Sequence, residues 1–233
     1  MDAIQQAGKM ISVIIPALNE ERSIGCCISR IKEEKCFAEI IVADGGSTDR
    51  TREIVAGFSE VRLIRSEKGR GIQMNSGAAH AKGNILLFLH ADTRLEPGWS
   101  AALRSSLDSE ELTGGAFSFR IDNPSARYRI VDALVALRCL LLKTPYGDQS
   151  IFVRRTTFEK IGGYPAIPLM EDIELVRKLK KAGKIVILRH TAYTDSRRWE
   201  KKGILRTYLS NQFLRILYMC GVSPRILAER YYR

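Results

Sequence analysis

Four short apolar runs alternate with helical patterns in the first half of this chain. The runs cover residues 11–16, 39–43, 61–65 and 85–90, and the segments between them place apolar residues at helical spacing. Strands that alternate with helices pair into a mostly parallel sheet that helices cover on both faces. The sequence therefore predicts an α/β fold.

The pattern changes after Leu112, where the elements become less regular. With 233 residues, of which 45% are hydrophobic, the chain suits one globular domain with a sizeable core. We expect strands over 114–121, 149–153 and 185–188, helices over 125–143 and 171–182, and a basic, aromatic, helical segment over 204–233. The first of these strands alternates in polarity, which predicts that one of its faces is exposed.

The chain is strongly basic, with a formal net charge of +11. Such a balance favours polyanionic partners, namely nucleic acid, an anionic membrane or a phosphorylated small molecule, although basic helix faces that aid solubility explain part of it. No helix-turn-helix pattern and no basic, aromatic-rich strand pair is present. We therefore expect no nucleic-acid partner.

The cysteines are few and unpaired in sequence. Their number is odd, and no CxxC pair occurs among Cys26, Cys27, Cys36, Cys139 and Cys220. Cys26 and Cys139 lie inside apolar helical patterns, so we expect reduced core residues there. This usage predicts a reducing, cytoplasmic compartment without a disulfide framework or a zinc site.

The termini and the apolar segments give no sign of membrane insertion. Residues 1–10 contain no long apolar stretch, so we expect no signal peptide. A spanning helix needs about 20 apolar residues. The longest candidate, residues 130–142, contains Asp132 and Arg138, and we interpret it as a buried or interfacial helix.

Carboxylates stand where predicted strands end or helices begin. Asp92 follows the apolar run 85–90, and a strand can deliver such a carboxylate to a ligand crevice, where it can bind a metal that holds a diphosphate. Asp44 follows the second run in a glycine-rich turn, which suits either a contact with a nucleotide base or a turn that opens the next helix. Asn19, after the first run, favours a helix cap over a base and ribose pocket.

The order of the motifs carries more information than any one of them. The series PALNEE, ADGGSTDRT, EKGRGIQMNSGA, LFLHADT, GGAF, YGDQSIFVRR, GGYP, MEDIEL and SRRW runs from Ile11 to Trp199. It resembles family-2 inverting glycosyltransferases of the GT-A fold. Within that family it is similar to the small stand-alone bacterial group linked to arsenosugar biosynthesis. The resemblance implies a nucleotide-sugar donor, usually a UDP-sugar, and Mg²⁺ or Mn²⁺ as cofactor.

The resemblance also implies residue roles in the donor site. Asp92 corresponds to the metal-binding carboxylate that ends the usual Asp-x-Asp motif, and His90 replaces the first carboxylate, which often contacts ribose. Asp44 corresponds to the residue that reads the base. The remaining donor contacts implied are Pro16, Ala17, Asn19 and Glu20 at the nucleoside, and Lys68, Gly69 and Arg70 beneath the ribose and phosphates.

Further roles concern catalysis and the acceptor. Asp172 corresponds to the catalytic base, with Glu171 beside it, although acids in the first turn of a helix are also ordinary. Arg198 and Trp199 resemble the end of the QxxRW signature, whose glutamine is absent here, so they suit either a contact with diphosphate and sugar or a solvated basic loop. The segment implied near the acceptor is Gly147, Asp148 and Gln149. His190 is open between a second metal ligand and a structural or exposed histidine.

The sequence thus predicts a metal-dependent inverting glycosyltransferase in a single domain over 1–233. Residues 11–112 form its nucleotide-binding half and 113–203 its acceptor-binding half. The basic segment 204–233 either packs on the domain or on a second subunit, or lies on anionic lipid at the inner face of the membrane. The acceptor is open between a small metabolite and a lipid-linked molecule.

Two other functions fit parts of the pattern. One is a nucleotidyltransferase that makes the sugar nucleotide, but such enzymes usually carry a glycine-rich loop after the first strand, and PALNEE has none. The other is a non-catalytic basic module that binds membrane or nucleic acid.

Overall fold

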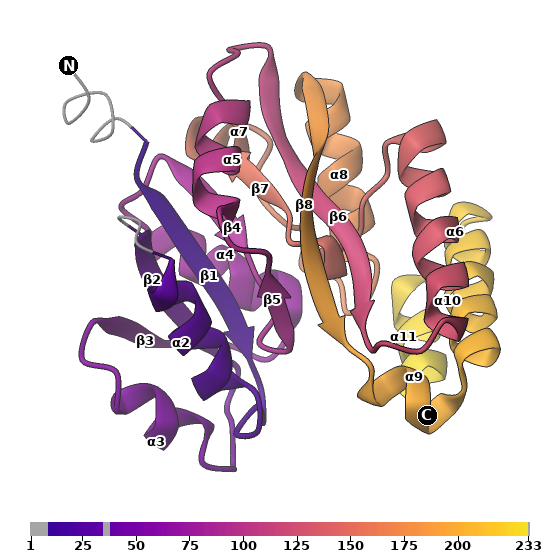
Figure 1. The fold of residues 1–233 in the computed structure, drawn as a ribbon, viewed down its shortest axis with the longest axis horizontal. Coiled ribbons are helices and arrows are strands. Elements are labelled where there is room, and N and C mark those ends of the chain that lie inside the picture. The colour runs from indigo at the N-terminus through magenta and orange to yellow at the C-terminus, as the bar shows by residue number, and fades with distance from the viewer. Residues whose placement is uncertain (1–8, 35–37, 233) are drawn as a thin grey trace.

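The dominant feature of the fold is a twisted eight-stranded sheet with the order β3-β2-β1-β4-β7-β6-β8-β5. The computed structural model describes residues 9–34 and 38–232, and of Arg198 only the backbone. Helices lie on both sides of the sheet (Figure 1). The C-terminal helices lie at the opposite side of the molecule from β3 and α3.

The strands confirm the predicted α/β architecture. They are β1 (Ile11–Ala17), β2 (Ala38–Asp44), β3 (Val61–Arg65), β4 (Ile85–Phe88), β5 (Thr93–Leu95), β6 (Leu112–Asp122), β7 (Phe152–Arg154) and β8 (Lys184–Asp195). β1 is parallel to β2 and β4, β2 to β3, and β6 to β8. β7 is antiparallel to β4 and β6, and β5 to β8.

The helices vary from one to four turns. They are α2 (Ile24–Glu33), α3 (Thr51–Ala56), α4 (Arg70–His80), α5 (Trp99–Ser106), α6 (Arg127–Leu142), the 3₁₀ helix η1 (Gly147–Gln149), α7 (Arg155–Lys160), α8 (Glu171–Ala182), α9 (Arg197–Lys202), α10 (Ile204–Met219) and α11 (Pro224–Tyr232).

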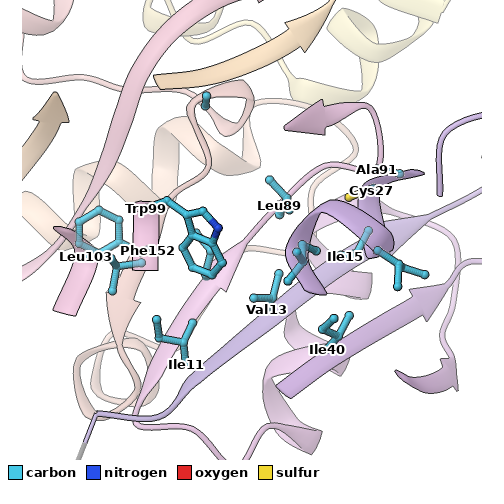
Figure 2. Close-up of a cluster of buried hydrophobic side chains, with 14 of the residues drawn as sticks. Ile11, Val13, Ile15, Cys27, Ile40, Leu89, Ala91, Trp99, Leu103 and Phe152 are labelled. Carbon is cyan, nitrogen blue, oxygen red and sulfur yellow. The ribbon is translucent and has the colours of Figure 1, made fainter. Parts of the chain in front are cut away.

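The core is built around β1, which is buried along its whole length. Ile11, Val13 and Ile15 enter one hydrophobic cluster (Figure 2), whereas Ile14 enters a second cluster on the other face of the sheet. Successive side chains of a strand point to opposite faces. A central strand covered on both faces therefore has a continuous apolar sequence, as residues 11–16 do.

Several sequence expectations differ from the observed elements. The strand expected over 149–153 is shortened to β7 at Phe152–Arg154, because Gly147–Gln149 form η1 and Ser150 has a positive φ of 52°. The strand over 114–121 is mostly buried rather than half-exposed, because helices cover both of its faces. Cys139 is buried as expected, whereas Cys26 is exposed, and Cys36 lies outside the described residues.

The C-terminal helices α10 and α11 return to the domain. Leu214 and Leu227 pack with Leu169 and Met170, which precede α8, in a small separate cluster. The faces of α6 and α10 that point away from the domain expose many apolar side chains. Among the helices that the structure describes, none is long and apolar enough to cross a membrane.

Candidate active site

The sequence-predicted carboxylates gather along the carboxyl edge of the sheet. The order of the first strands reverses between β1 and β4, and ligands of open α/β sheets bind in the crevice at such a reversal. Asp44 ends β2 on one side of this crevice, and Asp92 follows β4 on the other. The backbone N–H of Asp195, at the end of β8, donates to the carbonyl of Asp92 at 3.2 Å, which brings a further carboxylate to this edge.

Asp44 lines a cavity of about 690 Å³ that we call the β2 cavity. The residue is only 1% exposed, and its carboxylate accepts hydrogen bonds of 3.2 Å from the backbone N–H groups of Gly46 and Ser47. The remaining walls come mainly from the turn after β2 and from α3, with Arg50, Arg52, Arg65, Glu21, Asp49 and Glu53 as the charged members. Asp44 therefore both holds its turn and borders a space beside it.

The loop after β1 is joined to the loop after β2. Asn19 Oδ1 accepts a 2.9 Å bond from the N–H of Thr48, and the N–H of Asn19 donates to Ser47 Oγ at 2.9 Å. The prediction that Asn19 caps a helix is wrong, because α2 begins at Ile24 and Asn19 adopts a positive φ of 57°. Glu20 contributes a backbone bond to Thr51 Oγ1, whereas Pro16 and Ala17 lie buried within β1.

A second space, the central cavity of about 220 Å³, collects most of the predicted catalytic residues. They come from α4, the segment after β4, η1, α8 and α9. The predicted residues that line it are Arg70, His90, Asp92, Asp148, Asp172 and Trp199. Segments that are far apart in the sequence thus form one polar cavity.

Asp172 is held by backbone donors in this cavity. Its Oδ2 accepts a 2.8 Å bond from the N–H of Gly147, and its Oδ1 accepts one from Ile173 at 2.8 Å. A Cβ atom at position 147 would lie 3.2 Å from His90 Nε2 and 3.4 Å from Asp172 Oδ2. Glycine at 147 therefore lets the turn approach both side chains.

Glu171 occupies a different environment from its neighbour. It is 2% exposed, and its Oε1 lies 2.9 Å from Nε of Arg70. Burial raises the pKa of Glu171 to about 7, because the nearby Arg70 offsets only part of the cost of burying its charge. Burial, together with the Arg70 cation, lowers the pKa of His90. Glu171 thus anchors Arg70, while Asp172 borders the cavity.

The donor set suits a hard divalent cation. Asp92 and Asp195 line the same cavity wall, and Mg²⁺ is usually bound by one or two carboxylates together with substrate phosphates and water. Among the described residues, no group of three or more His, Cys, Asp or Glu side chains is arranged to hold a metal by itself. Asp92 therefore fits an ion whose shell a diphosphate completes.

His190 does not fit this set. Its ring lies beside Gly98, where a Cβ would be 3.4 Å from Nε2. Asp195 lies beside Asp92, because its N–H donates to the carbonyl of Asp92. His190 stands five residues before Asp195 on β8, which corresponds to roughly 16 Å along a strand. Of the two interpretations of His190, the register of β8 therefore favours a structural histidine over a second metal ligand beside Asp92.

Other predicted residues have structural environments. Gln149 is buried, donates to the carbonyl of Phe117 at 3.0 Å and accepts from Arg138 at 2.9 Å, so it braces the fold instead of facing an acceptor. Trp199 is 7% exposed and packs in an apolar cluster, with one part on the cavity. Lys68 is exposed and lines neither cavity, and the side chain of Arg198 lies outside the described residues.

Sequence reasoning missed several residues of the central cavity. Tyr146 precedes η1, and Asn211, Arg215 and Tyr231 come from the C-terminal helices. Asp195 gave no detectable signal, because the strand expected over 185–188 ends well before it, whereas β8 extends to Asp195. The C-terminal residues had none, because a helical pattern does not show which face meets a distant cavity.

This architecture and edge of carboxylates define the GT-A fold of nucleotide-diphospho-sugar transferases. Residues 12–162 match the family described as "Glycosyl transferase family 2". The chain belongs to this family. Of the functions considered from the sequence, family membership favours glycosyl transfer over nucleotidyl transfer and over a non-catalytic module.

Relatives and solved structures agree with the family. The chain is 33% identical over 165 residues to the PGL/p-HBAD biosynthesis glycosyltransferase of Mycobacterium bovis, a match that covers 68% of this chain and 64% of that protein. It is 27% identical to glycosyltransferase AglE of Haloferax volcanii, over 66% of this chain and 56% of that protein. The chain thus spans less than two thirds of the length of these relatives.

The fold is similar to that of glucosyl-3-phosphoglycerate synthase from Mycobacterium tuberculosis, solved with Mn²⁺, UDP and phosphoglyceric acid. The TM-score is 0.65 at 21% identity, with 94% of this chain and 81% of that chain covered. The mannosyltransferase PcManGT from Pyrobaculum calidifontis, solved with GDP-Man and Mn²⁺, gives a TM-score of 0.58 at 20% identity, with 77% and 56% covered.

Proposed function

We propose that this protein is an inverting glycosyltransferase that moves a sugar from a UDP-sugar to an acceptor hydroxyl with the help of Mg²⁺ or Mn²⁺. The observation that carries the proposal is that Asp172 and Asp92 line one cavity at the carboxyl edge of the sheet. One carboxylate can then serve the acceptor while the other serves the leaving diphosphate.

Asp44 and the loops around it are assigned to the donor nucleoside. The β2 cavity lies at the end of β2, beside the loop that Asn19 ties to Thr48. A carboxylate accepts hydrogen bonds from the N–H groups of a base. UDP occupies one structural neighbour and GDP-Man another, so the choice of uracil rests on the family resemblance and on Asp44.

Asp92 is assigned to the metal, with Asp195 as a second carboxylate on the same wall. When bound, a divalent ion neutralises the charge that develops on the leaving diphosphate. Mn²⁺ accompanies the nucleotide in both neighbours described above, which supports a metal requirement. Arg70 adds a fixed positive charge in the cavity, and its pairing with Glu171 keeps the guanidinium oriented.

Asp172 is assigned to proton removal. The acceptor oxygen attacks the anomeric carbon, the bond from that carbon to the diphosphate oxygen breaks, and the acceptor proton passes to Asp172. One displacement from the face opposite the leaving group inverts the anomeric configuration. The backbone bonds from Gly147 and Ile173 orient the carboxylate for this step.

The order of the motifs from Ile11 to Trp199 further supports a relationship to the stand-alone bacterial group linked to arsenosugar biosynthesis.

A screen for donor hydrolysis tests the proposed function. The purified chain is incubated with UDP-, GDP- and dTDP-sugars, each with Mn²⁺ or with excess EDTA, and release of the nucleoside diphosphate is measured. We expect slow release from one UDP-sugar that stops in EDTA. Equal release in EDTA would contradict the metal requirement, and a preference for GDP-sugars would contradict the assignment of Asp44 to uracil.

A further inference from the structure

A large cavity, which we call the lateral cavity, adjoins the central cavity beside the C-terminal helices. Its volume is about 990 Å³, and it lies between α8, the C-terminal half of α10 and the turn before α11. Its walls are mainly apolar, with Leu142, Ile167, Ile173, Val176, Met219 and Val222 among them. A space of this size and character suits a hydrocarbon chain.

The lateral cavity also carries an excess of positive charge. Glu174 is the acidic residue that lines it. The carboxylate of Glu174 accepts hydrogen bonds from Arg177 at 3.2 Å and from the hydroxyl of Tyr218 at 2.8 Å. Lys180, Lys181 and Arg215 line the same cavity. A ligand that carries an anionic group beside an apolar chain therefore matches it better than a neutral one does.

The two cavities share the side chains that separate them. Tyr146, Ile173 and Arg215 line both, and Ile173 directly follows Asp172 on α8. A molecule in the lateral cavity can thus present its polar end at Arg215, next to the carboxylate assigned to proton removal.

The lateral cavity opens beside an unusually apolar surface. The outward faces of α6 and α10, which lie next to each other (Figure 1), expose Ile130, Leu137, Leu140, Leu205, Leu209, Phe213 and Met219, with Leu140 76% and Met219 75% exposed. We call this the α6–α10 face. Met219 belongs both to this face and to the cavity wall, and Leu142, which is exposed at the end of α6, lines the cavity as well. Such a surface marks an interaction site.

The charges on the α6–α10 face favour an anionic lipid surface over a second protein. Asp132 is the one acid in these two helices, and it is paired with Arg129 at 2.8 Å. The exposed charged residues of the face are Arg127 and Arg206. Basic side chains around exposed leucines and phenylalanine are the pattern of a helix that lies on anionic lipid.

We propose that the acceptor is a membrane lipid with an anionic head group, which enters the lateral cavity from a bilayer that the α6–α10 face contacts. Its apolar chain occupies the cavity, its anionic group meets Arg215 and the lysines of α8, and its hydroxyl faces Asp172. This assignment rests on the proposed function, because it names the acceptor class of the same reaction.

Binding of short amphiphiles to the full chain tests the cavity. Isothermal titration below the critical micelle concentration compares decyl phosphate with inorganic phosphate and with decyl maltoside. We expect decyl phosphate to bind at least tenfold more tightly than either. Val222→Trp, which fills the cavity, and Lys181→Glu, which reverses a charge, should each weaken it about tenfold. Lys160→Glu, the same charge change on α7, should leave it unchanged.

Binding of UDP with Mn²⁺ is measured on the same samples to separate the two proposals. Two outcomes, each with normal UDP binding, would overturn the lipid acceptor alone. In the first, decyl phosphate binds no more tightly than inorganic phosphate. In the second, both cavity variants bind decyl phosphate as tightly as the unmodified chain does. If the unmodified chain shows no metal-dependent UDP binding, the proposed function is overturned, while the amphiphile titration still reports on the lateral cavity.

Vesicle co-sedimentation tests the route of entry. The chain should sediment with phosphatidylcholine vesicles containing phosphatidylglycerol, and the double variant Leu137→Glu, Leu209→Glu should not. A dimer that these two substitutions dissociate, without vesicle binding by the unmodified chain, would assign the α6–α10 face to a second copy and overturn the membrane route.

Discussion

The backbone N–H of Gly147 donates a 2.8 Å hydrogen bond to Oδ2 of Asp172, which fixes the first turn of α8 against η1. The two residues are 25 positions apart, and His90 lies close to the same glycine. The absence of a side chain at 147 therefore determines how closely the turn, His90 and Asp172 approach one another.

Gly147→Ala should lower turnover roughly tenfold while leaving the fold intact. The new Cβ would meet His90 Nε2 at 3.2 Å, so that these groups must shift by a few tenths of an ångström. Misplacement of catalytic groups by 1 Å can cost about 100-fold in rate. Steady-state kinetics measure the effect. Gly25→Ala is the control, because its Cβ would approach Ile54 at a similar 3.2 Å and neither residue lines the β2 cavity or the central cavity. Equal kinetics in both variants would contradict a constraint at Gly147.

Asp44→Asn should raise the dissociation constant of UDP by about 5- to 150-fold, which corresponds to the 1–3 kcal/mol cost of an unmatched polar contact. Asparagine retains one acceptor oxygen for the N–H groups of Gly46 and Ser47, so the turn should persist. Titration calorimetry measures the constant. Asp49→Asn, in the same cavity but bonded to Thr51, serves as the control. Unchanged UDP affinity in Asp44→Asn would remove Asp44 from the base site.

Glu171 should make folding stability fall as the pH rises. Its pKa is raised from 4.5 to about 7, so between these values the folded state holds a proton that the unfolded chain has lost. The protonated folded form is favoured at low pH, and this advantage disappears as the pH rises through about 7. Between pH 4.5 and 7, the free energy of unfolding of Glu171→Gln should therefore rise relative to that of the unmodified chain by up to about 3 kcal/mol, at about 1.4 kcal/mol per pKa unit.

Urea unfolding at several pH values measures this difference. Glu110→Gln, at an exposed position, is the matched control. A parallel pH profile for Glu171→Gln and the unmodified chain would show that Glu171 is ionised in the folded protein across this range.

Much of the fold could be predicted from the sequence because the signals of these elements are local. Residues 61–65 form β3 and 171–182 form α8 as expected, since an apolar run or a helical period marks each one. β5 could not be predicted, because Thr93–Leu95 is short and its pairing with β8 is distant in sequence. The helix cap expected at Asn19 failed for a related reason, since a bond to Thr48 replaces the local one.

The candidate site was predictable to the extent that its residues follow strands or open helices. Asp92, Asp172 and Arg70 meet in one cavity as the motif order implies. The partnership of Arg70 with Glu171 was not predictable, because it joins two helix starts about 100 residues apart through an ion pair whose carboxylate is buried. The same holds for Arg215, whose helix has no sequence feature that indicates contact with Tyr146.

Asp92→Asn should abolish turnover together with the metal-dependent part of UDP binding. The amide keeps the size of the side chain but removes the charge that a divalent cation requires. Titrations of UDP with Mn²⁺ and with EDTA separate the two parts of binding. Asp195→Asn should cause a smaller loss, because Asp195 is also paired with Arg197 at 2.8 Å. An enzyme that remains active in excess EDTA would contradict this assignment.

Asp172→Asn should lower turnover by about 10²–10⁴, the typical contribution of general-base catalysis, with UDP affinity nearly unchanged. Asparagine retains an oxygen to accept the bond from Gly147, so the turn should stay in place while the base is lost. Glu171→Gln should cost less, because Glu171 is buried against Arg70 and does not line the central cavity. Steady-state rates with the donor found in the hydrolysis screen, and UDP titrations, measure both effects. A dead Glu171→Gln enzyme beside an active Asp172→Asn enzyme would exchange the two roles, and full activity in both would exclude base catalysis by this pair.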